Sequence, residues 1–193
     1  MDFFEKNEEN LETLVFALTQ REKTTIAIGI YDKEDTCDKA IAYISKQFTA
    51  QKTCFFDLFG QKITSLLAYC RENLPKSEND NLPIVHITRI DPLLFISENH
   101  KVKSSPLVAQ INMERELLFH EVQALMVIWL TREGYNRLRM DAPDFMDWVV
   151  AAFTFESDGS ETTQALSFDI PKQSIEDKGK ANMFELSEKA NKL

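Results

Sequence analysis

The chain has 193 residues, of which 44% are hydrophobic and 27% are charged, enough for one sizeable core and too few for two full domains. Its formal net charge of −9 and the lack of a Lys/Arg cluster exclude an ordinary nucleic-acid surface, because phosphate binding needs grouped positive side chains. We therefore expect an acidic molecule whose partner is another protein.

The N-terminus and the cysteines indicate the compartment. Residues 1–6 are acidic and contain no uninterrupted apolar run, so we expect neither a secretory signal nor a membrane anchor. Cys37, Cys54 and Cys70 are odd in number, and each lies within an apolar periodic segment. That placement is typical of buried, reduced cysteines rather than of disulfides or zinc ligands. We expect a cytoplasmic protein that binds no membrane.

Apolar runs alternate with helical spacings along most of the chain. Short, nearly continuous apolar runs predict strands that are buried on both faces of a parallel sheet. The expected strands cover residues 24–30, 52–59, 82–90, 124–130 and 149–155. Apolar residues that recur on one helical face predict amphipathic helices. The expected helices cover residues 9–20, 35–49, 63–70, 107–122 and 133–140, with a further helix that begins at Pro143.

This alternation predicts the fold class and the domain boundary. Strands that alternate with helices form a mostly parallel sheet, which right-handed crossovers cover on both faces. We expect a single three-layer α/β domain with about five strands over residues 1–156, with a layout like that of P-loop NTPases and Rossmann-like proteins. Residues 157–193 lack enough apolar surface to fold alone. We expect them to form an acidic tail that is largely disordered or ordered by a partner.

The turn after the first strand lacks the glycines of a phosphate loop. A P-loop reads GxxxxGK[ST] at this place, whereas this chain has no glycine after Gly29 before the next helix. The turn carries instead Asp32, Glu34 and Asp35, whose carboxylates would repel phosphate. The layout is thus similar to a P-loop NTPase from which the phosphate loop is absent.

A non-standard phosphate site remains an open alternative. Lys33 or Lys39, together with the helix that starts near Thr36, would form its anion cradle. Asp91 follows the third strand, where a Walker-B-like acid would hold magnesium. The simpler interpretation of Asp91 is a strand-end turn, because Asp-Pro commonly starts turns and a magnesium site needs the phosphates that it bridges.

The remaining reactive side chains form no catalytic or metal-binding pattern. His86, His100 and His120 fall in different segments, so no pair has the spacing of a helical metal site. Cys54 and Cys70 have no obvious basic partner, and the serines include no GxSxG elbow. We therefore expect no enzymatic activity, no cofactor and no metal.

Three motifs in the second half of the chain carry a resemblance to a known family. They are an Asn-x-x-Arg-[Glu/Asp] helix, an apolar strand that ends in Leu-Trp-Leu, and an Ala-Pro-Asp-Phe-x-x-Trp turn. The matching residues are Asn112, Arg115, Glu116, Trp129, Leu130, Ala142, Pro143, Asp144, Phe145 and Trp148. This part resembles the distal half of a degenerate NTPase module of bacterial signalling and conflict proteins, an inactive form of the STAND class of P-loop NTPases.

The resemblance implies a non-catalytic regulatory module of a bacterial signalling or antiviral defence system. Its partner would be an effector, a sensor or a tetratricopeptide-repeat component, and the motif residues are the candidates for facing it. A structural role explains the same residues: Trp129, Phe145 and Trp148 as apolar core anchors, and Arg115 as a bridge to Glu116, Asp141 or Asp144.

Two other functions remain open. One is a nucleotide switch that uses the non-standard phosphate site. The other is a small-molecule sensor, because the carboxyl ends of parallel strands form a crevice where ligands bind. No residue pattern selects a ligand for that crevice, so the regulatory module is the favoured interpretation.

Overall fold

The computed structural model describes residues 2–20, 24–75, 81–98 and 101–158. His100 and the tail beyond residue 158 lie outside these ranges, so the predictions about them are not addressed by the structure.

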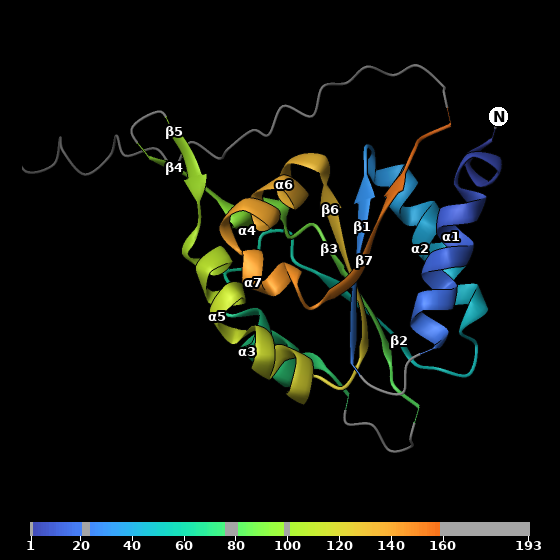
Figure 1. The fold of residues 1–193 in the computed structure, drawn as a ribbon, viewed down its shortest axis with the longest axis horizontal. Helices are drawn as coiled ribbons and strands as arrows, with labels where there is room; N and C mark the ends of the chain where they lie inside the picture. The colour runs from blue at the N-terminus through green and yellow to red at the C-terminus, as the bar shows by residue number, and fades with distance from the viewer. Residues whose placement is uncertain (1, 21–23, 76–80, 99–100, 159–193) are drawn as a thin grey trace, which may run out of the picture. The chain divides into compact units, whose positions relative to one another are not determined.

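A five-stranded parallel sheet forms the centre of the domain, which confirms the predicted α/β fold class (Figure 1). Its strands are β1 (Thr25–Tyr31), β2 (Thr53–Asp57), β3 (Ile84–Thr88), β6 (Leu125–Thr131) and β7 (Val149–Phe155). They lie in the order β2-β3-β6-β1-β7, and every pairing is parallel. The strand β1, which lies between β6 and β7, is buried along its whole length, as its apolar run predicts.

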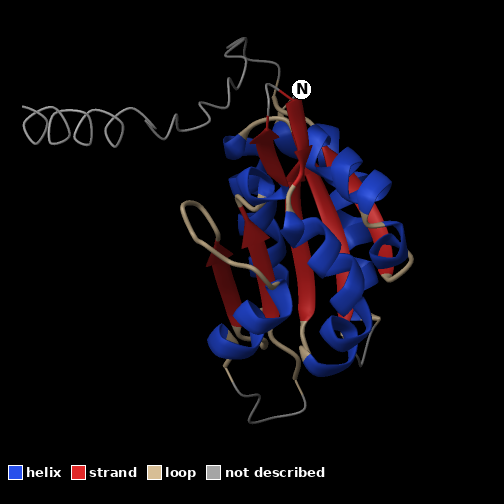
Figure 2. Cartoon of the chain, turned by 90° about the vertical axis from the view of Figure 1, so that its left-hand side faces the viewer, coloured by secondary structure: helices blue, strands red, loops and turns tan. Residues whose placement is uncertain are grey.

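Helices cover both faces of this sheet, as Figures 1 and 2 show. The helices α1 (Phe3–Thr19) and α2 (Glu34–Gln47) lie on one face. The other face carries α3 (Leu66–Asn73), α4 (Asp91–Leu94), α5 (Pro106–Glu121), α6 (Arg132–Asp141) and α7 (Pro143–Met146). Two hydrophobic clusters fill the spaces between the sheet and these helix layers.

The start of the first helix and a hairpin after α4 differ from the expectation. The first helix begins at Phe3 rather than near residue 9, because Asp2 and Glu5 form a capping box at its N-terminus. A short antiparallel hairpin, β4 (Phe95–Glu98) with β5 (Lys101–Ser104), follows α4 and was not expected. Its four-residue strands are largely exposed, so they lack the apolar alternation that predicts a strand.

Gly29 shows why the first strand contains a glycine. A Cβ atom at this position would lie 2.4 Å from the indole ring of Trp129 on the neighbouring strand β6. Trp129 itself is fully buried and packs against Phe155 with 5.5 Å between the ring centroids. Gly29 therefore accommodates a large core side chain.

The three cysteines are free; Cys37 and Cys70 are buried and Cys54 is partly buried. Burial raises the pKa of the Cys70 thiol to about 12, so this side chain is a neutral part of the core. Among the helices of the described residues, none has the length and apolar character needed to span a bilayer.

Candidate functional site at the carboxyl edge of the sheet

The carboxyl ends of the parallel strands meet at one edge of the sheet, where ligands of α/β proteins bind. Asp32 follows β1 and Asp91 follows β3 at this edge. Between their strands lies β6, which ends at Thr131. Asp32 lies in the turn where a P-loop protein would carry its phosphate loop. Asp91 lies where a Walker-B-like acid would hold magnesium.

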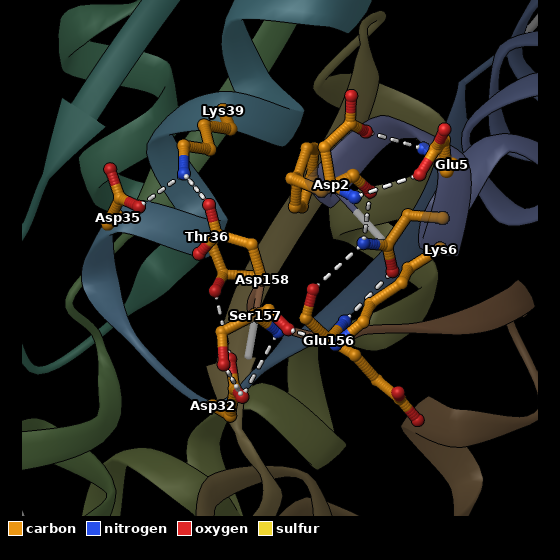
Figure 3. A network of polar contacts seen from close by, with 12 residues as sticks. Asp2, Glu5, Lys6, Asp32, Asp35, Thr36, Lys39, Glu156, Ser157 and Asp158 are labelled. Carbon is orange, nitrogen blue, oxygen red and sulfur yellow. Dashed lines mark hydrogen bonds and ion pairs between the residues drawn. The ribbon is translucent and has the colours of Figure 1, made fainter. Parts of the chain in front are cut away.

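Asp32 anchors the chain that leaves β7 (Figure 3). One carboxylate oxygen accepts a hydrogen bond from the Thr36 hydroxyl at 2.9 Å. The other oxygen accepts from the backbone N–H of Ser157 at 3.2 Å and from its hydroxyl at 2.8 Å. Partial burial opposes ionisation, but the hydrogen bonds from Ser157 and Thr36 outweigh it and lower the pKa of Asp32.

A second group of contacts holds the same segment. The Lys39 ammonium lies 2.7 Å from Asp35 and 3.0 Å from Asp158, and Figure 3 shows it between the two carboxylates. On the other side, Asn7 of α1 pairs with the backbone of Glu156, donating to its carbonyl and accepting from its N–H. These contacts hold residues 156–158 against α1 and α2.

These contacts occupy the head of α2, where a P-loop would cradle phosphate. Lys33 is the N-cap residue of α2, and its carbonyl accepts from the backbone N–H groups of Thr36 and Cys37. Thr36 is buried, and its hydroxyl is engaged by Asp32. The carboxylate of Asp32 therefore uses the Thr36 hydroxyl that the alternative phosphate site would need.

Asp91 has a different environment. It is buried at the start of α4, and its Oδ1 accepts from the Thr131 backbone N–H at 2.9 Å and from the Thr131 hydroxyl at 2.6 Å. The same hydroxyl accepts from the N–H of Gly134 at 3.1 Å and so caps α6. Asp91 Oδ2 is buried without a hydrogen-bond partner in the described residues. Burial raises the pKa of Asp91, and the hydrogen bonds from Thr131 offset only part of that shift.

Asp91 thus begins a short helix instead of an isolated turn, and Pro92 is compatible with the first turn of that helix. Gly134 lies directly against this carboxyl group, because a Cβ atom at Gly134 would come within 2.1 Å of Asp91 Oδ1. The sequence contained no signal for this pairing of a strand-end acid with a helical glycine.

The family-motif residues connect α5 to α7. Asn112 Oδ1 accepts from the backbone N–H of Phe145 at 2.9 Å, and Asn112 Nδ2 donates to Asp144 at 3.3 Å. Arg115 donates to the carbonyl of Asn112 at 2.8 Å and lies 3.8 Å from Asp144 and 3.9 Å from Glu116. The motif residues distant in sequence are therefore neighbours in space.

The other members of the motif have separate roles. Pro143 lies in the first turn of α7. Trp129 and Phe145 are fully buried, so neither is available to a partner in this structure. Trp148 is half-buried and packs against Phe119 with 4.7 Å between the ring centroids. Asp141, the third carboxylate considered for Arg115, pairs with Arg137 and Ser104 instead.

Trp129 also determines the state of His86, which sequence reasoning left unassigned. The indole N–H donates to His86 Nδ1 at 3.1 Å, so the proton of the neutral ring resides on Nε2. Within the described part of the chain, His86 Nε2 is buried without a partner. Burial lowers the pKa of His86 to about 4, so the ring is uncharged near neutral pH.

A cleft of about 530 Å³ lies between α2, β2 and β3. Its lining includes Tyr31, Glu34, Asp38, Ser45, Phe55 and Arg89. The Arg89 guanidinium pairs with Asp57 and lies 5.1 Å from the centre of the Phe59 ring. Arg89 has a φ angle of 53°, an uncommon conformation for a residue with a side chain. Sequence analysis did not single out this cleft, because its walls come from three separate segments.

In the part of the chain that the structure describes, no group of three or more His, Cys, Asp or Glu side chains is arranged to hold a metal ion. The two carboxylates of the sheet edge use separate donors, Ser157 and Thr36 for Asp32 and Thr131 for Asp91.

Comparison with one solved structure supports the fold. The structure of the Aeropyrum pernix ORC2 protein in its ADP form matches with a TM-score of 0.50 and 8% sequence identity, over 81% of this chain and 49% of that chain. The ADPNP-ADP complexes of the same protein match with a TM-score of 0.43 and 10% identity, over 78% of this chain and 48% of that chain. No protein-family model and no curated protein sequence matches.

This chain therefore spans about half the length of the ORC2 chains that it matches. At 8% identity the likeness shows the fold alone. The fold is P-loop NTPase-like, as the alternation of strands and helices predicted.

Proposed function

We propose that the chain is a non-catalytic regulatory module that binds another protein, built on a P-loop NTPase-like fold that does not hydrolyse nucleotide. The observation that carries this proposal is the Asp32 network at the head of α2. A phosphate bound at that place would meet the Asp32 carboxylate, and it would have to compete with that carboxylate for the Thr36 hydroxyl. Both effects oppose nucleotide binding.

The family resemblance supports a finer assignment. Asn112, Arg115 and Asp144 match the motif of inactive STAND-type modules, and their side chains form one connected contact between α5 and α7. We infer a cytoplasmic component of a bacterial signalling or antiviral defence system. Its partner would be an effector, a sensor or a tetratricopeptide-repeat protein.

One observation favours a second candidate, a nucleotide-binding switch. Asp91 Oδ2 is a buried carboxylate oxygen that no donor of the described residues satisfies. A magnesium ion that bridges nucleotide phosphates would satisfy it. In that case Lys33 and Thr36 would supply the anion cradle, and the hydrogen bond from the Thr36 hydroxyl to Asp32 would have to open.

Isothermal titration of the full chain with magnesium-ATP and magnesium-GTP, together with thermal shift, tests the two candidates. We expect neither heat of binding nor a change in melting temperature at millimolar nucleotide. A nucleotide present at a hundredfold excess over its dissociation constant would stabilise the fold by ~2.7 kcal/mol, which is easily measured.

Three variants make the titration decisive. Asp32→Asn removes the repulsive charge, and we expect it to remain unable to bind nucleotide if the fold has no phosphate site. Binding by the wild type that is lost in both Asp91→Asn and Thr36→Val would contradict the regulatory proposal and establish the nucleotide switch.

A further inference from the structure

We propose that the outer edge of β2, together with the acidic cleft beside it, binds an extended basic segment of a partner protein as an additional strand. This inference rests on the proposed protein-binding function and names the surface and the partner chemistry.

The hydrogen-bond ladder leaves main-chain groups of β2 directed away from the sheet. β2 is one of the two edge strands of the sheet. Its residues Thr53, Phe55 and Asp57 stand opposite Ile84, His86 and Thr88 of β3. The N–H of Ile84 donates to the carbonyl of Lys52, and the N–H of Leu58 donates to the carbonyl of Thr88. In a parallel ladder every second residue of a strand bonds to the same neighbouring strand. The main-chain groups of Cys54, Phe56 and Leu58 therefore point toward β3. The main-chain groups of Thr53, Phe55 and Asp57 therefore point outward.

An aromatic side chain lies beside these outward groups. Phe55 is 61% exposed, although it stacks on the buried ring of His86 with 5.7 Å between the centroids. The neighbouring Phe59 is 65% exposed. An edge strand with exposed large apolar side chains is a template for strand addition, because a partner strand would satisfy the main chain and cover the ring.

The charge of the cleft selects a basic partner. Glu34 and Asp38 lie one turn apart on the exposed side of α2 and line the cleft with Asp57 and Arg89. The Arg89 guanidinium is paired with Asp57, so the carboxylates of Glu34 and Asp38 set the sign of the field. Lys or Arg side chains on an added strand would complement these two carboxylates.

The same charges argue against a second copy of this chain as the occupant. Two chains paired through β2 would bring their acidic clefts together, and each chain carries a formal net charge of −9. Side chains of an added strand alternate between the two faces of the sheet. The expected segment therefore carries Lys or Arg and an apolar residue at every second position, so that all of them lie on the cleft side.

The first experiment measures amide hydrogen exchange of the full chain by NMR. In the free protein we expect slow exchange at the amides of Cys54 and Phe56 and fast exchange at Thr53, Phe55 and Asp57. The probe is a synthetic library of acetylated heptapeptides with random residues at positions 2, 4 and 6 between threonines, selected on the immobilised chain. We expect enrichment of Lys and Arg, and each enriched peptide should slow exchange at the three outward amides at least about tenfold.

Matched variants separate charge at the cleft from charge in general. Glu34→Gln with Asp38→Asn should weaken the enriched peptide roughly threefold to thirtyfold, as expected for two exposed ion pairs. Glu8→Gln with Glu9→Gln makes the same charge change on the exposed side of α1 and should leave the affinity unchanged. Thr53→Pro removes one outward N–H and should also weaken binding; if that variant does not fold, the exchange data on the wild type decide the main-chain bonding.

Several results would overturn the inference. They are enrichment of acidic or neutral peptides, equal loss of affinity in the two paired-charge variants, and protection at amides other than the three outward ones. Concentration-dependent doubling of the mass, with protection of the three amides in the absence of peptide, would assign the edge to a second copy. If no peptide binds and no nucleotide binds, the inference about the β2 edge is wrong, but the proposed protein-binding function still stands.

Discussion

Asp32 and Asp91 are the same residue type at the same edge of one sheet, yet their environments shift the two pKa values in opposite directions. Asp32 accepts hydrogen bonds at both oxygens from Thr36 and Ser157, which stabilise its charge. Asp91 is buried, and among the described residues only one of its oxygens accepts hydrogen bonds, so its charged form is disfavoured. Donors brought by distant segments therefore decide what an acid after a strand does.

The largest expected loss of stability comes from replacing Gly134, the glycine that packs on Asp91. In an ordinary helix Gly→Ala stabilises by about 1 kcal/mol. At Gly134 we expect the opposite, a loss of about 3 kcal/mol or more, because the new Cβ would lie 2.1 Å from Asp91 Oδ1. Urea unfolding of Gly134→Ala measures the change.

Two controls test whether the contact with Asp91 causes that loss of stability. Gly60 has a φ angle of 69° and open space around it, so Gly60→Ala should cost only about 1 kcal/mol of backbone strain. In an Asp91→Ala background the Gly134→Ala change should become much cheaper, since its collision partner is gone. Additive losses in the double variant would show that the contact with Asp91 is not the cause.

The contribution of His86 to the pH dependence of stability must be measured before the aspartates are compared, because His86 also titrates in acid. The pKa of His86 is about 4 in the folded state against 6.5 for an unperturbed histidine. This difference corresponds to ~3 kcal/mol of folding free energy. The unfolded chain binds the proton first, so this stability is present above about pH 6.5 and is lost as the pH falls toward 4. We expect urea unfolding of the wild type to show this loss and His86→Gln to lack it. An unchanged pH profile in the variant would contradict the assignment.

The smallest effect comes from neutralising the two aspartates in a His86→Gln background. The raised pKa of Asp91 favours folding below the unfolded pKa of 3.8, and this contribution is lost as the pH rises through the folded value. Asp91→Asn should therefore gain stability relative to its parent as the pH rises. The lowered pKa of Asp32 gives the opposite sign, a contribution present above 3.8 and lost as the pH falls through the folded value.

We expect Asp32→Asn to cost about 1 kcal/mol near pH 7 through weaker hydrogen bonds to Ser157 and Thr36. That cost should shrink in acid, when the carboxyl group of the parent is also neutral. Parallel pH profiles of unfolding for the two variants would show that the aspartates share one environment, contrary to the structure.

Much of the fold was predictable because local patterns report burial. The apolar runs located the strands of the sheet, and the apolar spacing within residues 9–20 predicted an amphipathic helix, in which Leu11, Leu14 and Leu18 are buried. The hairpin β4–β5 was not predictable, since its short exposed strands carry no such pattern. The capped start of α1 at Asp2 was readable in principle from the Asp-x-x-Glu spacing of a capping box.

From the candidate site, the sequence showed the acidic turn after β1 and the motif residues. The glycine-free acidic turn after β1 has no P-loop pattern, and Arg115 was expected to bridge to Glu116, Asp141 or Asp144. The partners of the acids were not predictable, because Ser157 lies 125 residues from Asp32 and Thr131 lies 40 residues from Asp91. Contacts between residues so far apart in the sequence produce no periodic pattern from which they could be predicted.

Local sequence was enough to establish the α/β class, the positions of the strands and the acidic character of the turn after β1, because each depends on residues that are neighbours along the chain. The strand order, the opposite pKa shifts of Asp32 and Asp91, and the juxtaposition of Phe55 with the acids of α2 arose only in the folded chain. The physical reason is that burial and hydrogen bonding act between segments that only folding brings together.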